Sequence, residues 1–507
     1  MSDKPNLLFI FSDQHSAEVA GCYGDPIAAT PNLDRLASAG VTFDNAYCPS
    51  PICTPSRMAM MTARHPHRNR VWGNEDILHS GIPTMAHSLG AAGCHPTLIG
   101  RLHSVGPDQL LGYARREIGD HHPNWLGVPR IDMGPLQGTA SPDRRSLRQS
   151  GIGLSAYDVK DEQVADRAVA TLEDYADRLR SGTMERFAMT VGLMLPHAPF
   201  VARKADYERF AGKVGLAARR APAPEDDHPW IARWRAHRDI VDVTEQEELR
   251  ARTAYYGLVH AMDRMIGRIL DRLDALGLAD NTLVVYASDH GEQIGEHGLW
   301  WKHTFYEASA RVPVIMRWPD RLPAGERRTQ VVNLIDLTAT MLEAMGAPPL
   351  PNADGVSFLG VARDAAAPWA NRTFSEYCYG SEFDWGIPGT GQIRMIRTER
   401  YKLVYYHGYR PQLFDLTADP DETRDLAADP AHAAIRQQLT RQVLEGWDPD
   451  AIERHIEASI PDKRILARWA ETVRPESRFM WEMKPEHNRL DDQQTAHASA
   501  PAAAASR

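Results

Sequence analysis

The chain alternates between apolar runs and helical patterns. Residues 6 to 13, NLLFIFSD, form a continuous apolar run that ends in Asp13. Such a run is typical of a strand buried on both faces of a parallel sheet. Residues 30 to 40, TPNLDRLASAG, combine a threonine cap, a proline in the first turn and a glycine stop, which predict a helix. A strand, a loop and a helix therefore follow one another at the N-terminus.

The same alternation recurs to about residue 365. Helical patterns occur at residues 84–93, 161–179 and 259–276, and apolar strand patterns at 95–100, 187–200, 281–288 and 312–319. The strand at 187–200 is expected to end near His197. Because these strands are apolar throughout and alternate with helices, the pattern predicts a doubly wound α/β domain.

Other segments depart from this alternation. Residues 104–155 lack periodicity and are interpreted as long loops over a site. Residues 211–248 are highly charged and are interpreted as an excursion. After residue 369, short β-rich runs predict a small antiparallel sheet. We therefore predict a catalytic domain at 1–368, a C-terminal subdomain at 369–485 and a disordered tail at 486–507.

Composition and charge narrow the functional classes. The 507 residues carry a formal net charge of -10, which argues against broad binding to nucleic acid. No apolar stretch is long enough to cross a bilayer, and the N-terminal run lacks a cleavage pattern. Five scattered cysteines favour a reducing compartment over a disulfide framework. We expect a cytoplasmic protein with neither a nucleic-acid nor a membrane partner.

Polar residues follow the predicted strands. In an open α/β sheet, the residues beyond the carboxyl ends of the strands converge on the ligand site. Carboxylate and amide oxygens with a histidine would suit a hard divalent cation, Ca²⁺ first and Mn²⁺ second. The simpler alternative is that the aspartates cap turns and the histidines are buried core residues. The residues concerned are Asp13, Gln14, Arg101, His103, His197, Asp289 and His290.

The stretch SPICTPSRMAMMTAR, residues 50–64, carries a second chemical signal. Pro55 suits the first turn of a helix, and a helix N-terminus favours anions. Cys53 would then face an anion site, with Arg57 and Lys302 as sources of fixed positive charge. A half-buried structural cysteine is the alternative interpretation.

The motifs CTPSR, SDQ near the N-terminus and SDHGE near residue 290 resemble those of type I sulfatases in the alkaline-phosphatase superfamily, over residues 5–430. The resemblance implies an alkaline-phosphatase-like doubly wound mixed sheet flanked by helices, with a smaller C-terminal antiparallel-sheet subdomain. It also implies that a formylglycine-generating or maturase enzyme converts Cys53 to formylglycine, and that the enzyme uses a divalent metal.

The resemblance assigns roles by position. Arg57 would hold the hydrated aldehyde, His103 would act as the base that releases sulfate, and His197 and Lys302 would face the ester oxygen. Arg101 stands where most sulfatases carry lysine, Ala63 replaces a usual glycine, and Asn74 matches a polar position near the site. The implied metal ligands are Asp13, Gln14, Cys53, Asp289 and His290.

The chain is similar to the choline-sulfatase and arylsulfatase branch. This similarity implies a small-molecule sulfate monoester as substrate, either alkyl, such as choline sulfate, or aryl. We expect the loop at 377–385 to border the substrate pocket, with Asp384 and Trp385 in contact with substrate, and we expect a homo-oligomer, either a dimer or a tetramer. The further aromatic candidates are Trp125, Trp300, Trp301, Tyr377 and Phe383.

Two other functions remain open from the sequence. A phosphonate monoester or phosphodiester hydrolase would use the same constellation, because tetrahedral oxyanions differ little to such a pocket. A non-catalytic sulfatase-like protein would keep Cys53 unmodified. The apolar segment at 465–483 would pack either on its own domain or on a neighbouring subunit.

Overall fold

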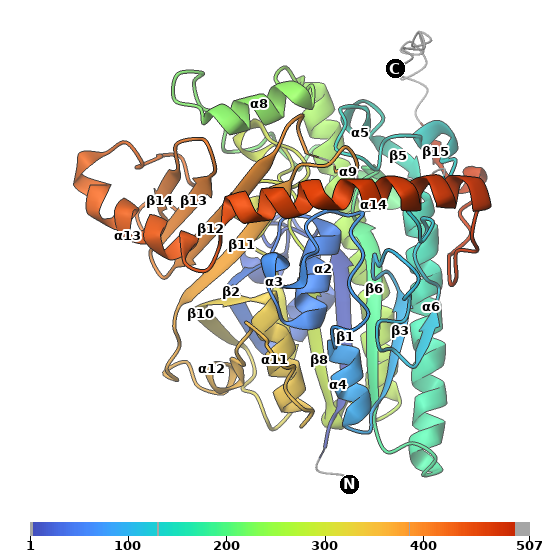
Figure 1. Ribbon diagram of the computed structural model, residues 1–507. Helices are drawn as coiled ribbons and strands as arrows, with labels where there is room; N and C mark the ends of the chain where they lie inside the picture. Colours follow the sequence, from blue (N-terminus) through green and yellow to red (C-terminus); the bar gives the residue numbers. More distant parts are fainter. Residues whose placement is uncertain (1–3, 129–130, 385, 492–507) are drawn as a thin grey trace.

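The computed structural model describes residues 4–128, 131–384 and 386–491. Its main sheet has eight strands in the order β10-β2-β9-β8-β1-β6-β3-β4, with helices on both sides (Figure 1). The strands are β1 (Asn6–Asp13), β2 (Val41–Tyr47), β3 (His95–Gly100), β4 (Arg115–Glu117), β6 (Phe187–Pro196), β8 (Thr282–Ser288), β9 (Val314–Arg317) and β10 (Glu326–Asn333).

The register of the sheet brings several strand ends to one edge. Strand β1 pairs in parallel with both β8 and β6, so that Ile10 lies beside Tyr286 and Val191. Strand β3 runs parallel to β6, whereas β9 is antiparallel to β2 and β8. The sheet is therefore mixed, as expected. The carboxyl ends of β1, β3, β6 and β8 share an edge, where the loops that follow them form the site.

The two faces of the sheet are buried in separate apolar clusters. Leu7, Phe9 and Phe11 of β1 belong to one cluster, and Leu8 and Ile10 belong to the other. This alternation follows from the two-residue period of a strand. Helices α6 (Ala156–Arg180) and α9 (Glu245–Ala275) cover the second face, whereas α2 (Cys53–Thr62), α4 (Met85–Ala91) and α11 (Leu334–Ala344) contribute to the first. A strand that is apolar throughout is explained by burial on both faces.

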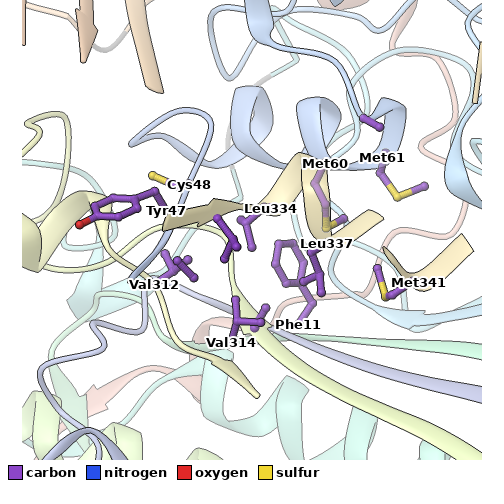
Figure 2. Packing of buried hydrophobic residues seen from close by; sticks show 14 of the residues in the cluster. Phe11, Tyr47, Cys48, Met60, Met61, Val312, Val314, Leu334, Leu337 and Met341 are labelled. Carbon is purple, nitrogen blue, oxygen red and sulfur yellow. The ribbon is translucent and has the colours of Figure 1, made fainter. Parts of the chain in front are cut away.

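Helix α2 is held firmly against the sheet. Figure 2 shows side chains of α2, α11 and β1 gathered in the first cluster, among them Met60, Leu337 and Phe11. The Thr338 hydroxyl of α11 also donates a hydrogen bond to the Met60 carbonyl, at 2.7 Å. All ten residues of α2 are buried. The first turn of this helix is therefore a rigid platform for Cys53.

The predicted antiparallel sheet is present. It has the order β11-β12-β13-β14 and is formed by β11 (Arg372–Tyr379), β12 (Gly391–Thr398), β13 (Tyr401–Tyr406) and β14 (Gln412–Asp415). Helices α13 (Ala433–Leu444) and α14 (Pro449–Val473) follow it. In Figure 1, α14 extends from this sheet to the side of the molecule that carries α6. The first apolar cluster includes residues of both sheets; the division at residue 368 stays a prediction.

Three segments differ from the sequence interpretation. Helix α9 begins at Glu245, well before residue 259, because Thr244 and Glu247 form a capping box. The charged segment 211–248 contains α8 (Pro229–His237), whose buried Trp230 donates a hydrogen bond to the Tyr379 hydroxyl. The predicted disordered tail began at residue 486, whereas β15 (Arg489–Leu490) pairs with β5 (Gly151–Leu154). Residues 492–507 lie outside the described residues.

Two negative findings apply to the described residues. Across the described ranges, no helix combines the length and apolar character needed to span a membrane. All five cysteines lie within the described ranges and none forms a disulfide. The remaining, short elements are α1 (Pro31–Ser38), α3 (Pro66–Asn69), α5 (Arg145–Arg148), α7 (Lys204–Glu208), α10 (Glu307–Ala310), α12 (Leu359–Arg363) and β7 (Val201–Ala202), and the 3-10 turns η1 (Gly21–Tyr23), η2 (Gly134–Leu136), η3 (Ala279–Asn281), η4 (Glu296–Gly298), η5 (Pro430–His432) and η6 (Pro485–His487).

Candidate active site

Cys53 is the first residue of α2, as the loop-to-helix pattern predicted. The preceding Ile52 is extended and occupies the N-cap position, without a side-chain capping bond. The Cys53 sulfur is buried, 3.2 Å from Nε2 of His290 and 3.3 Å from Nζ of Lys302. A thiol that only filled the core would need neither contact. Its surroundings are therefore those of a reacting group rather than of a structural cysteine.

The two strand-end aspartates meet His290 beside Cys53. Ligand atoms of Asp13, Cys53, Asp289 and His290 all lie within 4.8 Å of one another, and all four residues are buried. Nδ1 of His290 lies 3.0 Å from the Gly291 carbonyl oxygen, so Nδ1 carries the proton and the lone pair of Nε2 faces the cluster. Two carboxylates and an oriented imidazole lone pair fit a divalent cation.

Gln14 completes the oxygen-rich side of this cluster. Its backbone is left-handed, with φ of 68°, and its backbone N–H donates to the Asp289 carboxylate at 3.0 Å. The side-chain nitrogen donates to the buried Glu292, so the oxygen Oε1 points the other way and accepts from Lys302 at 2.5 Å. Burial raises the pKa of Glu292, although its hydrogen-bond donors oppose that shift. Glu292 thus acts as the orienting partner of Gln14.

Arg57 links both aspartates. Its Nε donates to Asp289 at 2.8 Å and its Nη2 donates to Asp13 at 3.2 Å. Its Nη1 is buried and, among the described residues, has no hydrogen-bond partner. A buried guanidinium N–H without a partner is costly unless a ligand accepts from it. The arrangement fits an oxyanion or a hydrated aldehyde at position 53.

Arg101 forms a second bridge, on the other side of Asp13. Its Nε donates to Asp13, and its Nη2 donates to Nδ1 of His103 at 2.6 Å. The His103 backbone N–H in turn donates to Asp120 at 2.9 Å. Burial and the charge of Arg101 hold the pKa of His103 well below its usual range, so the ring is neutral. The fork of a guanidinium makes both contacts at once, which a lysine ammonium in its place would not reproduce.

The charge balance keeps Asp13 ionised. Burial would raise the pKa of its carboxyl, but the charges of Arg101, Arg57 and Lys302 hold that pKa well below its ordinary value. A buried carboxylate surrounded by cations is the form that binds a metal. The cationic excess around Asp13 and Asp289 also favours an anionic ligand.

His197 and Lys302 lie together at Cys53. Nζ of Lys302 is 2.9 Å from Nε2 of His197, and Nδ1 of His197 lies 2.6 Å from the Ala198 carbonyl oxygen. Because an ammonium group can only donate, Nε2 accepts and Nδ1 carries the ring proton. Burial and the charge of Lys302 lower the pKa of His197. The group that donates toward Cys53 is therefore the Lys302 ammonium. His197 is a neutral imidazole.

A cavity of about 270 Å³ opens on Cys53. The segment at 104–155, interpreted from sequence as loops over a site, supplies much of its wall. Asn74 also lines it and accepts a 2.9 Å hydrogen bond from the backbone N–H of Thr54, next to Cys53. The lining residues are Cys53, Asn74, Glu75, Arg101, His103, Val105, His121, His122, Pro123, Trp125, Leu126, Gly127, Val128, Ile131, Met133, Gln137, Gly138, Ala140, Ser141, Pro142, Tyr157, His197, Lys302, His303 and Met483.

The aromatic candidates are placed differently from one another. Trp125 lines the cavity. Trp300 and Trp301 are buried in a separate apolar cluster, and Tyr377 packs edge-on against Trp230.

Asp384, near the end of the 377–385 loop, lies away from the Cys53 cavity. Asp384 accepts hydrogen bonds from the N–H groups of Gly380 and Ser381 and lines a second, smaller cavity with Lys463. Trp385 lies outside the described residues. A substrate contact by Asp384 or Trp385 stays a prediction.

Several site residues were not identified from sequence. Glu292 lies inside the quoted SDHGE motif, and its place directly after the predicted ligands was a usable signal. Asp120, His121 and His122 lie in the loop segment at 104–155. That segment has no hydrophobic periodicity, so no sequence pattern marks these residues. Asp120 reaches the site only because it bonds both the His103 backbone and Arg116. Such contacts depend on tertiary structure.

Most of the chain matches known protein families. Residues 5–347 match the family described as Sulfatase. Residues 295–447 match the family described as N-sulphoglucosamine sulphohydrolase, C-terminal.

Individual relatives span nearly the whole chain. It is 30% identical over 503 residues to a choline-sulfatase of Rhizobium meliloti (strain 1021), covering 95% of this chain and 94% of the relative. It is 29% identical over 461 residues to arylsulfatase K of Rattus norvegicus, covering 85% and 76%. Among solved structures, a phosphonate monoester hydrolase from Silicibacter pomeroyi superimposes with a TM-score of 0.71 at 25% identity, covering 87% and 95% of the two chains.

Proposed function

This chain belongs to the sulfatase family, a family of sulfuric ester hydrolases, and from that premise we propose that it cleaves a small sulfate monoester through formylglycine at position 53. The observation that carries the proposal is the buried contact of the Cys53 sulfur with His290 and Lys302. The substrate would be an alkyl ester such as choline sulfate, or an aryl ester.

The oxyanion end of the substrate is matched by fixed cations. Arg57, Arg101 and Lys302 are all buried, and each contacts Asp13, Gln14 or Cys53. Preorganised donors in a site shielded from water stabilise the charge that develops during sulfate transfer. Arg57 Nη1, which lacks a partner among the described side chains, would donate to the modified residue or to a sulfate oxygen.

The modified residue would supply the nucleophile. When Cys53 is a formylglycine hydrate, one hydroxyl supplies the attacking oxygen and the second allows sulfate to leave by breaking the C–O bond, which restores the aldehyde. Lys302, through its bond to His197, holds a proton for the departing alcohol. We assign the removal of the proton from the second hydroxyl to Nδ1 of the neutral His103, which accepts from Arg101 in this structure and would exchange that hydrogen bond for the hydroxyl proton. Covalent catalysis replaces one slow step with two faster ones.

Asp13, Gln14, Asp289 and His290, together with residue 53, would hold a divalent cation, Ca²⁺ first and Mn²⁺ second. Such a cation, when bound, supplies positive charge to the sulfate oxygens and lowers the pKa of a bound hydroxyl. The donor set is mostly oxygen, which fits these hard cations better than it fits zinc.

We further propose how Cys53 is modified, how the chain assembles and in which compartment it works. A formylglycine-generating or maturase enzyme would act on CTPSR before Cys53 is buried. The protein would work as a cytoplasmic homo-oligomer. The family and the absence of disulfides among the five cysteines are compatible with this arrangement.

The proposal is tested by comparing reaction classes on one preparation. We expect kcat/KM for p-nitrophenyl sulfate to exceed that for p-nitrophenyl phenylphosphonate and bis(p-nitrophenyl) phosphate. The rival function, supported by the phosphonate monoester hydrolase relative, predicts the reverse order. Choline sulfate turnover, followed by sulfate release, decides between alkyl and aryl esters. Better turnover of the phosphorus esters would overturn the sulfatase assignment.

Replacing Arg101 tests the fork geometry. Arg101→Lys keeps a positive charge near Asp13 but loses one of the two contacts that link Asp13 and His103. Because a hydrogen bond to a charged group contributes about 1.5–3 kcal/mol, we expect kcat for a sulfate ester to fall by about tenfold to a hundredfold. The exposed Arg35, paired with Asp271, is the control. An unchanged kcat in Arg101→Lys would show that the fork is dispensable.

A further inference from the structure

The C-terminal end of the chain lies outside both family matches. The matched residues end at 447, yet α14 and residues up to β15 continue across the molecule (Figure 1). We call residues 474–490 the C-terminal strap. The strap therefore lies beyond the residues that the two family matches cover.

The strap is bonded to the cavity wall on both sides of the paired histidines His121 and His122. The backbone N–H of Trp481 donates to the Asp120 carbonyl at 2.8 Å. The side chain of Asn124 donates to the Arg478 carbonyl at 3.1 Å. The strap therefore braces the loop that carries His121, His122 and Pro123 of the cavity lining.

The end of the strap is pinned next to another lining residue. Asn488 accepts a 2.9 Å hydrogen bond from the backbone N–H of Ala156, the neighbour of Tyr157. Beyond it, Arg489 and Leu490 pair with β5. The Trp481 indole donates to Gln163 of α6 at 2.9 Å. The strap is thus attached at several points rather than resting loosely on the surface.

Glycines in the loop allow a close approach of the C-terminal segment. A Cβ on Gly119 would lie 2.0 Å from the Phe479 carbonyl oxygen, and one on Gly127 would lie 2.3 Å from that of Ala467. Trp125 of the cavity wall also packs edge-on against Trp469 of α14, with ring centroids 4.9 Å apart. Both α14 and the strap therefore fit the loop closely.

Met483 is the residue of the described strap that lines the cavity. It is 6% exposed and belongs to the same apolar cluster as Met133, with Ile131 packed against that cluster. Trp125, Val128 and Ile131 continue the apolar part of the lining. The charged and imidazole groups that contact Cys53 come from other segments. The strap thus adds apolar surface to the cavity and no charge.

We propose that Met483, held in place by the C-terminal strap, contacts the apolar part of the alcohol leaving group and sets the size limit of the ester. This inference rests on the proposed sulfatase function, because it assigns the cavity beyond Cys53 to the leaving group. Removing or enlarging Met483 changes selectivity between leaving groups and leaves the sulfate end untouched.

The test compares leaving groups of two sizes. kcat/KM is measured for p-nitrophenyl sulfate and for the larger 4-methylumbelliferyl sulfate in the wild type, Met483→Ala and Met483→Phe. We expect the ratio of the larger to the smaller substrate to rise in Met483→Ala and to fall in Met483→Phe, each by roughly tenfold, because a pocket discriminates by about this factor for small changes in volume. The inhibition constant of inorganic sulfate should stay unchanged in both variants.

Controls separate the outcomes. Met480→Ala changes an exposed strap residue, 37% exposed, and should leave the ratio unchanged, while Met483→Leu keeps the volume and should stay near the wild type. A ratio unaffected by Met483→Ala and Met483→Phe, or an equal loss for both substrates, would overturn the assignment. The same ratio of kcat/KM values is measured with the matching phenylphosphonate esters. Faster turnover of these esters than of the sulfates would overturn the proposed function, whereas the effect of the Met483 variants on the ratio would still test the role of Met483.

Discussion

Cys53→Ala is expected to reduce sulfate-ester turnover by about a thousandfold or more, because the variant loses the only nucleophile that the proposed covalent route uses. Binding should persist, since Arg57, Arg101 and Lys302 remain in place. Turnover of p-nitrophenyl sulfate and the inhibition constant of inorganic sulfate are the two measurements. The expected result is a lost kcat with a nearly unchanged inhibition constant.

A matched control distinguishes this effect from the loss of any buried thiol. Cys94 is also buried but does not line the cavity at Cys53. Cys94→Ala should keep wild-type turnover, with only a modest decrease in melting temperature from the lost packing. Substantial turnover by Cys53→Ala, measured after the removal of contaminating sulfatases, would mean that the nucleophile lies elsewhere.

Asp13→Asn is expected to abolish metal binding and to reduce kcat by a comparable factor. The amide has the same shape, but it removes the negative charge that Arg57 and Arg101 share and weakens the ligand set with Asp289 and His290. Breaking a buried ion pair by neutralising one partner also destabilises the fold, by about 3–5 kcal/mol. Metal content per chain by elemental analysis, melting temperature and kcat are therefore measured together.

The control for Asp13→Asn is an aspartate on the surface. Asp271 pairs with Arg35, and its side chain is 66% exposed, so Asp271→Asn should change neither metal content nor kcat. Metal retained at the wild-type level in Asp13→Asn would remove Asp13 from the ligand set. Metal lost with full activity would remove the cation from the chemistry.

The central strands of the main sheet were predictable from the sequence because their signals are local. The run at 6–13 is apolar at every position since both faces of β1 are buried. A residue that follows such a strand is placed by the sheet itself, so Asp13, Asp289 and His290 were expected together and meet beside Cys53. Position after a strand carries information that does not depend on side-chain contacts.

Other parts depend on contacts that a pattern does not contain. Strand β10 begins with exposed polar residues, which hide it from a search for apolar runs. Trp230 of α8 packs on Tyr379 and Tyr406 of the antiparallel sheet, and Trp234 packs on Trp230 and His303. Met483 reaches the cavity because β15 pairs with β5, far away in sequence. Each of these features is decided by tertiary structure, which local periodicity does not report.

The identity of residue 53 in the mature protein tests the account most directly. The peptide that carries CTPSR is analysed by mass spectrometry after purification from the native host, with the peptide that carries Cys94 as an internal reference for an unmodified thiol. We expect an aldehyde or its hydrate at residue 53 in active preparations, with the modified fraction proportional to kcat. An unmodified thiol at residue 53 in fully active protein would contradict the account.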